Sequence, residues 1–411
     1  MAISQLYPNS RPTLNLNFAR SKTLDPRITF TRNSTATYVG SDGLIKTAAA
    51  GEARFDHDPV TGDCRGLLVE ESRTNSVQTS SDFTGFPIWG TASVTASSGT
   101  APDGTNTATL VTPTGSGGRT SIYKPLGFGS GTVATVSIYA KPSGKSWIWL
   151  LDPGSQVYVF FNVSTGVVGT VDSSVTNTSI EPAGNGWYRC SVTRTPTANY
   201  QINFGVCDGD NSEACAVNGS DGILFWGGQL EEGRNNGFPT SYIPTAGSTI
   251  TRAADLCEIT NDNLSSWYNS NEGTNVIEYN SVGHSRNGGV EVYLNYIVGN
   301  YRFEFNVDGK VTGRTVAVQV WGDLSPALLH NVNNKVACSQ SWLTGEGSFS
   351  SNGIDPIVAT NNPTNPPYNP TRMAFGFGLY QNRGYGMNGY IQRFSYYPTR
   401  VSDSQLQELT S

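Results

Sequence analysis

GILFWGGQLEEGRNNGFPTSYIPTAGSTITRAAD occupies residues 222–255, and this stretch divides the chain in two. It begins with four consecutive apolar residues, 223–226, a run that is too short for a helix and is stopped by two glycines, so it predicts a buried strand. It ends in a segment rich in Ser and Thr that Pro239 and Pro244 interrupt, which is typical of a linker. A closing strand, an acidic corner and a linker predict a boundary between two β domains.

Composition limits the kinds of partner that the chain can have. Its 411 residues suit two or three domains, each large enough to bury a core without disulfides. Charged residues make up 14%, the net charge is −6 and there is no basic run, so we expect neither nucleic-acid binding nor membrane insertion. The 46 glycines and 21 prolines follow no period, which favours turn-rich β structure over collagen or disorder.

The middle part, residues 79–250, carries repeated strand patterns. They are short, rich in aromatic or β-branched residues and bounded by Gly, Pro or Asn. The clearest are residues 133–139, 157–161, 187–192 and 200–204. Helical periodicity is missing, so we predict an antiparallel two-sheet jelly roll.

The last part, residues 255–411, predicts a second antiparallel sandwich. A strictly alternating run at 301–307 ends at Asp-Gly, 308–309, which indicates a type I′ hairpin turn. Ser402 and Gln405 form the S-x-x-Q pattern of a capping box, so a short helix is expected at the C-terminal end.

The first part, residues 1–78, alternates weakly between apolar and polar residues. Turn signals separate its short extended pieces, and we predict an extended attachment segment with little core of its own. The first twelve residues lack the basic and apolar regions of a secretory signal, so we expect synthesis in the cytoplasm without a signal peptide.

Three stretches resemble one family of proteins. GGQLEEG and FPTSYIPTAGSTITRAAD, within 227–255, are similar to the end of a carbohydrate-binding-like domain of bacteriophage tail and virion structural proteins. PTLNLNFARSKTLDPRITF, which opens the stretch 12–75, is similar to their amino-terminal segment. GYIQRFSYYPTRVSDSQLQELT, residues 389–410, is similar to the last strand and terminal helix of their laminin-G-like lectin domain, a concanavalin-A-like sandwich.

This resemblance implies a function and a location. It implies a virion structural protein, made in the host cytoplasm, of the tail-fibre or spike type. Such an adhesin binds host-surface polysaccharide, contacts other tail or baseplate proteins and assembles as a homo-oligomer, in fibres a homotrimer. Two alternatives stay open: an architectural protein that decorates a tail or capsid without binding sugar, and a polysaccharide depolymerase.

The best local signal for sugar binding is a pair of tryptophans. Trp147 and Trp149 are two residues apart on a predicted strand, so they share one face of a sheet. Flat aromatic rings stack on the C–H faces of sugar rings. Tyr158 joins them if its strand is adjacent. The competing interpretation is that this face is simply the domain core, because large aromatic residues are usually buried.

No pattern in the sequence indicates catalysis. The three histidines have no G-x-S-x-G nearby and no metal-ligand spacing. The glutamate pairs at 70–71 and 231–232 resemble the two carboxylates of a glycosidase. Adjacent glutamates on a strand point to opposite faces, so we expect structural ion pairs with Arg73 and Arg234 instead. We therefore expect no catalytic residues, no cofactor and no enzymatic activity.

Residues 208–212 resemble a calcium-binding loop in part. DGDNS spaces its oxygen ligands by two, but Glu213 stands where an EF-hand loop needs glycine. A solvated hairpin loop is therefore the favoured interpretation, with no structural metal. Cys207 and Cys215 flank the loop and could bridge a hairpin, but reduced thiols are the favoured state in a protein made in cytosol.

Overall fold

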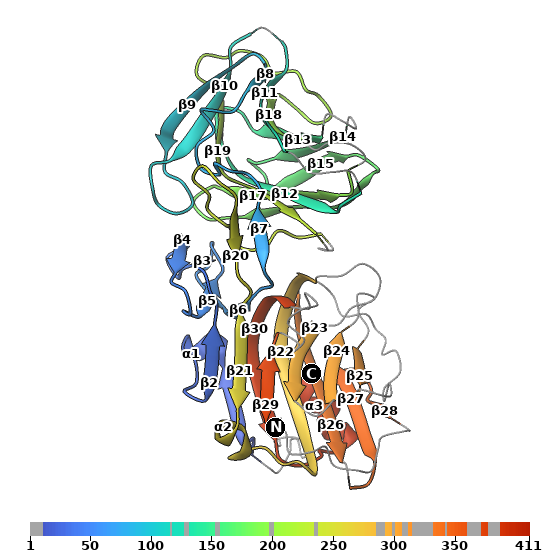
Figure 1. The fold of residues 1–411 in the computed structure, drawn as a ribbon. Helices are drawn as coiled ribbons and strands as arrows, with labels where there is room; N and C mark the ends of the chain where they lie inside the picture. The colour runs from blue at the N-terminus through green and yellow to red at the C-terminus, as the bar shows by residue number, and fades with distance from the viewer. Residues whose placement is uncertain are drawn as a thin grey trace.

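The computed structural model shows two lobes, each built from two antiparallel β-sheets (Figure 1). The prediction of an all-β protein with sandwich domains is confirmed. The described residues are 11–411 apart from 116, 127–130, 153–156, 197–200, 234–236, 285–291, 298–300, 306–310, 315–331, 342, 360–370 and 377–386. The predicted Asp-Gly turn at 308–309 lies outside them.

The upper lobe contains the middle part of the chain. Its first sheet has the strand order β16-β17-β12-β19-β10-β9, and its second has the order β15-β14-β13-β18-β11-β8. The strands are β8 (Ile88–Gly90), β9 (Ala92–Gly99), β10 (Ala108–Pro113), β11 (Thr120–Pro125), β12 (Ala134–Ser143), β13 (Trp147–Asp152), β14 (Val157–Asn162), β15 (Val167–Val171), β16 (Val175–Pro182), β17 (Tyr188–Arg194), β18 (Gln201–Cys207) and β19 (Gly222–Glu232). All four strand patterns singled out in the sequence correspond to strands.

Alternation along the strands separates the core of the upper lobe from its outer faces. Ile148 and Leu150 of β13 point between the sheets, as do Phe204 and Val206 of β18. Because side chains on a strand alternate between faces, the neighbouring residues of β13 and β18 lie on the outer face of the second sheet. This leaves Trp149 outside the main core.

The lower lobe contains the last part of the chain. One sheet has the order β28-β27-β26-β22-β30-β6-β5 with β1 also paired to β30, and the other has the order β2-β21-β29-β23-β24-β25. The elements are β1 (Leu14–Asn17), α1 (Phe18–Ser21), β2 (Ile28–Thr31), β5 (Arg54–His57), β6 (Cys64–Val69), β21 (Leu256–Thr260), α2 (Asp262–Ser265), β22 (Glu272–His284), β23 (Val292–Ile297), β24 (Tyr301–Phe305), β25 (Val311–Arg314), β26 (Asn333–Ser341), β27 (Glu346–Ser351), β28 (Ile357–Ala359), β29 (Arg372–Phe375), β30 (Met387–Tyr397) and α3 (Asp403–Thr410). The capping box at Ser402 and Gln405 is present, so the predicted terminal helix is confirmed.

The first part of the chain is built into the lower lobe. Strand β1 pairs with β30, with Leu14 opposite Tyr396, and β2 pairs with β21. Leu16 and Phe18 are 3% and 1% exposed and lie in the core of that lobe. The expectation of an extended attachment segment with little core of its own is wrong. These N-terminal strands belong to the two sheets that are built mainly from the last part of the chain. A small hairpin, β3 (Ala36–Val39) and β4 (Ile45–Ala48), projects from this segment.

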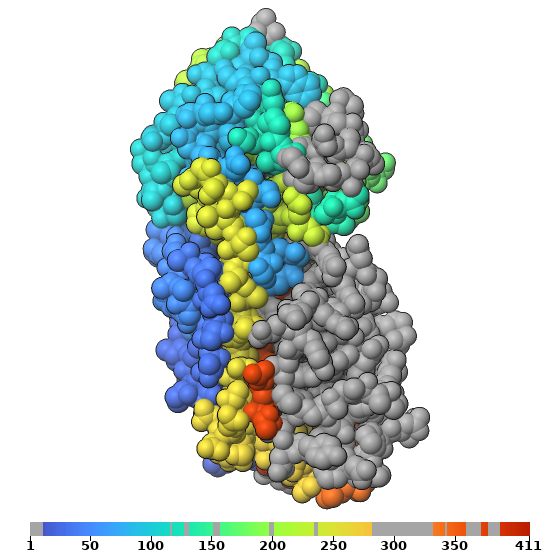
Figure 2. Space-filling view, viewed as in Figure 1, coloured from blue at the N-terminus to red at the C-terminus, as the bar shows by residue number. Residues whose placement is uncertain are grey.

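The linker between the lobes is docked along most of its length. Its strand β20 (Ile250–Arg252) pairs with β7 (Arg73–Asn75), and Figure 2 shows the linker (yellow) lying against the N-terminal segment (blue). Tyr242 and Ile243 are buried, and the Ile243 amide donates to Gln229 Oε1 at 2.7 Å. Residues 246–251 are exposed.

Candidate functional site

The predicted tryptophan pair lies on the outer face of the second sheet of the upper lobe. Trp147 and Trp149 share this face, and Tyr158 lies on β14, which pairs with β13. The structure therefore brings the three predicted residues together. We define the aromatic face as Trp89, Trp147, Trp149, Tyr158 and Phe160.

The three predicted residues differ in exposure. Trp149 is fully buried, and its indole lies so close over Gly205 that a Cβ there would meet Cε2 at 1.9 Å. The Trp149 and Tyr158 rings form an edge contact with centroids 5.7 Å apart. Trp147 and Tyr158 are half-buried. On the aromatic face, only these two and Trp89 are therefore partly exposed, and Trp149 is buried among them.

A polar bridge crosses the aromatic face, and no pattern in the sequence predicted it. Arg119 lies over the Trp89 ring, 3.8 Å from its centroid, and donates from Nη2 to the Tyr158 hydroxyl at 3.0 Å. Glu213 pairs with the same guanidinium. Burial and then the nearby Glu213 carboxylate raise the pKa of Tyr158. Because the bridge joins residues 94 positions apart, only the fold reveals it.

Two buried donors on this face lack hydrogen-bond partners among the described residues. They are Trp149 Nε1 and Asn203 Nδ2, from residues that are 0% and 1% exposed. Buried indole N–H groups usually find an acceptor. Two other buried indoles of the described residues do so: Trp187 donates to a backbone carbonyl and Trp226 donates to Thr107 Oγ1. The outer face of β13 and β18 thus carries two buried N–H donors that have no acceptor among the described residues.

The outer face of the other sheet in the upper lobe also carries aromatic residues, but the chain covers them. Tyr242 of the linker packs on Trp226 at a centroid distance of 4.5 Å and on Tyr139 at 6.2 Å. Tyr242 is 4% exposed. That face is therefore used to dock the linker.

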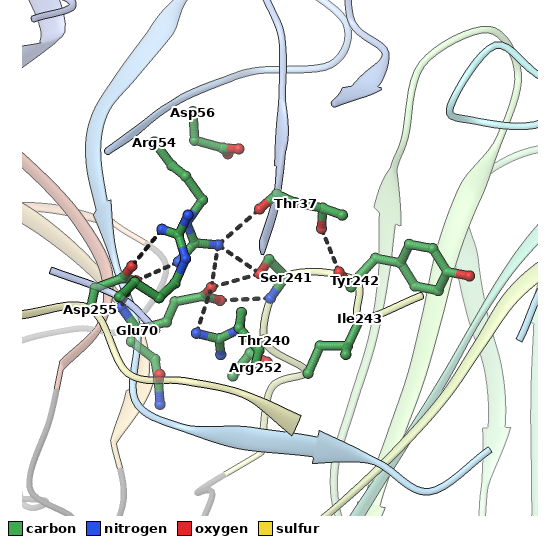
Figure 3. A network of polar contacts seen from close by, with 12 residues as sticks. Thr37, Arg54, Asp56, Glu70, Thr240, Ser241, Tyr242, Ile243, Arg252 and Asp255 are labelled. Carbon is green, nitrogen blue, oxygen red and sulfur yellow. Dashed lines mark hydrogen bonds and ion pairs between the residues drawn. The ribbon is translucent and has the colours of Figure 1, made fainter. Parts of the chain in front are cut away.

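At the junction of the lobes, a cluster of buried charges holds the linker to the N-terminal segment (Figure 3). Arg54 pairs with Glu70 at 2.8 Å and with Asp255, while Arg32 pairs with Asp255 at 2.9 Å. Burial alone would raise the pKa of Glu70, but Arg252 and Arg54 lower it to about 2. The carboxylate is thus held ionised as a structural group.

Three of the four glutamates in the two predicted pairs have partners within the chain, as Glu70 has in the cluster above. Glu71 pairs with Arg73, as expected from the sequence. Glu231 accepts from the Thr240 amide at 3.0 Å and so fastens the linker to β19. Arg234, the predicted partner of the second pair, lies outside the described residues.

A cleft of about 940 Å³ lies between the lobes, beside this cluster. Asp56 and Tyr390 line it from the lower lobe, and Arg189 lines it from the upper lobe. Burial raises the pKa of Asp56 to about 6, although the Val39 amide donates to its carboxylate at 2.6 Å. Three carboxylates of the cleft, those of Asp56, Asp58 and Glu70, have partners within the chain, so the aromatic face is the stronger candidate site.

The loop at 208–212 is tied to its surroundings by its own carboxylates. Asp208 pairs with Lys145 at 2.5 Å, and Asp210 accepts from the Thr170 amide at 2.7 Å. Among the described residues no three His, Cys, Asp or Glu side chains gather as a metal site requires. Cys207 and Cys215 are free, buried thiols. No helix in the described part of the chain is long and apolar enough to cross a membrane.

Comparison with known proteins identifies no family. No protein-family model and no curated protein matches the sequence. Among solved structures, the CBM40 of a Ruminococcus gnavus IT-sialidase bound to α2,3-sialyllactose is 19% identical, covers 36% of this chain and 87% of its own, and has a TM-score of 0.31. Domain 4 of AbnA, a GH43 extracellular arabinanase from Geobacillus stearothermophilus in complex with arabinotriose, is 14% identical, with 43% and 82% covered and a TM-score of 0.31.

A third solved structure matches over a larger share of this chain. The CBM22-1–CBM22-2 tandem domain of Paenibacillus barcinonensis Xyn10C is 9% identical, with 82% of this chain and 99% of its own covered and a TM-score of 0.24. Identities and TM-scores this low leave the function to be inferred from the residues of this chain.

Proposed function

We propose that the chain is a bacteriophage virion structural protein of the tail-fibre or spike type that binds host-surface polysaccharide through the aromatic face. The resemblance of residues 12–75, 227–255 and 389–410 to such proteins supports the virion role. Homotrimeric assembly would place several copies of a weak site on one particle, and multivalency then makes binding effective.

One observation carries the binding proposal. The upper lobe has two outer faces with aromatic side chains, and the linker covers only the one that bears Tyr139 and Trp226. On the other, the half-buried Trp147 and Tyr158 stand on the outer side of a sheet whose core residues face inward. Aromatic rings left at the surface beside polar groups suit sugar rings, whose C–H faces stack and whose hydroxyls form hydrogen bonds.

A glycan array tests this proposal. Trp147→Ala should abolish glycan binding, while Tyr188→Ala, which removes a half-buried ring from the opposite sheet, should leave it unchanged. Full glycan binding by the Trp147→Ala variant, equal to that of Tyr188→Ala, would rule out the aromatic face as the site.

A purely architectural role is the second candidate. The buried ion pairs that join Arg54 to Glu70 and Asp255 hold the linker in place, as a decoration protein also requires. An array without any bound glycan, together with antibody labelling of purified particles, would favour that role. We propose no catalytic role, because three of the four glutamates singled out for hydrolysis have partners within the chain: Glu70 and Glu71 are ion-paired, and Glu231 accepts from Gln229 and Thr240.

A further inference from the structure

The polar bridge on the aromatic face lies across the strands that carry the buried indole. Arg119 directly precedes β11, and Tyr158 lies on β14. Strands β18 and β13 run between these two in the sheet. The hydrogen bond from Arg119 to Tyr158 therefore spans the strands of Gly205 and Trp149. A ligand that reached Trp149 would have to open this bridge.

The third member of the bridge is a carboxylate of the chain itself. Glu213 pairs with the guanidinium of Arg119, which also donates to the hydroxyl of Tyr158. A guanidinium fork and a phenol hydroxyl are the groups that bind a carboxylate from outside. Trp89, against which Arg119 stacks, adds an aromatic surface beside them. The arrangement is thus a carboxylate site in which Glu213 is the occupant.

Exposure indicates that this occupant is exchangeable. The side chains of Arg119 and Glu213 are 26% and 30% exposed, unlike the buried pairs at the junction of the lobes. Ion pairs that solvent reaches contribute little to stability. Rotation of the Glu213 side chain would free Arg119, which stays in place on Trp89.

We propose that the aromatic face takes an acidic saccharide whose carboxylate replaces that of Glu213 between Arg119 and Tyr158. The inference rests on the proposed glycan binding and names its ligand class. A neutral sugar would leave Arg119 without a counter-charge, whereas a sugar carboxylate restores it. The unpartnered donors Trp149 Nε1 and Asn203 Nδ2 suit the same acceptor-rich ligand, because both donate.

The test compares acidic glycans with their neutral forms. The full-length protein is applied to an array that holds oligosaccharides of uronic and sialic acids, each beside its carboxyl-reduced form. We expect the acidic forms to bind at least tenfold more tightly. Glu213→Gln, which weakens the internal competitor by exchange of one oxygen, should raise affinity for the acidic forms about three- to tenfold. Arg119→Gln should remove the preference.

Glu258→Gln is the matched control. It makes the same change of charge in another partly exposed pair, with Arg372 at 3.0 Å, in the lower lobe. It should leave the affinities unchanged. Equal binding of acidic and reduced glycans, with no effect of Glu213→Gln, would overturn the inference and leave the proposed function intact. If no glycan binds, both this inference and the proposed glycan binding are ruled out.

Discussion

Arg54 and Glu70 form an ion pair with 2.8 Å between Nη1 and Oε2, and their side chains are 0% and 2% exposed. Arg54 also pairs with Asp255, which stands 201 residues further along the chain at the end of the linker. One guanidinium therefore joins the N-terminal segment to the linker. A buried charge that loses its partner is costly, so this pair should be sensitive to substitution.

Arg54→Met should lower the free energy of unfolding by about 3–5 kcal/mol, because Glu70 and Asp255 would both lose a buried partner. Urea denaturation measures the loss. Arg27→Met is the control, since its pair with Asp25 at 2.7 Å is 32% and 22% exposed. That variant should lose less than about 1 kcal/mol. Similar small losses in both variants would mean that the cluster does not hold the lobes.

Asp56→Asn should change the pH dependence of stability. The folded pKa of Asp56 is raised to about 6, so ionisation of this carboxyl destabilises the fold. Its contribution to stability is fully present below its ordinary pKa of 3.8 and is lost as pH rises through about 6. Two pKa units correspond to about 3 kcal/mol at neutral pH.

The Asp56→Asn variant has no carboxyl to ionise at this position. Its stability relative to the unsubstituted protein should therefore improve between pH 4 and pH 8. Urea denaturation at pH 4, 6 and 8 gives the comparison. A difference between the two proteins that stays constant with pH would contradict the raised pKa.

Trp149→Ala and Trp147→Ala should distinguish a tryptophan that stabilises the fold from one that binds glycan. Trp149 is 0% exposed, so its truncation should cost about 3–5 kcal/mol. For a lobe of this size, that loss lowers Tm by about 6–20 °C. Trp147 is half-buried, so its truncation should lower Tm far less while glycan binding is lost. Thermal unfolding checks the order, and equal shifts would place both rings in the core.

Limited proteolysis should cut the linker in its exposed part only. Arg252 is 1% exposed and pairs with Glu70 at 3.3 Å, so trypsin should leave the bond after it intact. The exposed Lys22 provides a positive control for trypsin. A protease without basic specificity should cut within 246–251. Early tryptic cleavage at Arg252, followed by mass spectrometry, would show that the linker is loosely held.

Local sequence was enough to predict several strands and the terminal helix. The apolar run at 223–226 lies in β19, and the alternation around Trp147 placed both tryptophans on one face of β13. Ser402 and Gln405 predicted the terminal helix. These features depend on residues within a few positions of each other, since capping and side-chain alternation are local properties of the backbone.

Tertiary structure decided which strands pair and which polar groups meet. Leu14 lies opposite Tyr396 in one sheet, and Arg119 reaches both Glu213 and Tyr158. A strand's sequence specifies which of its faces is buried, whereas the strand that it pairs with depends on how the whole chain closes around a core. The all-β class and the tryptophan pair were therefore determined by the sequence alone. The docked first segment and the carboxylate site on the aromatic face arise from contacts between residues far apart in the chain.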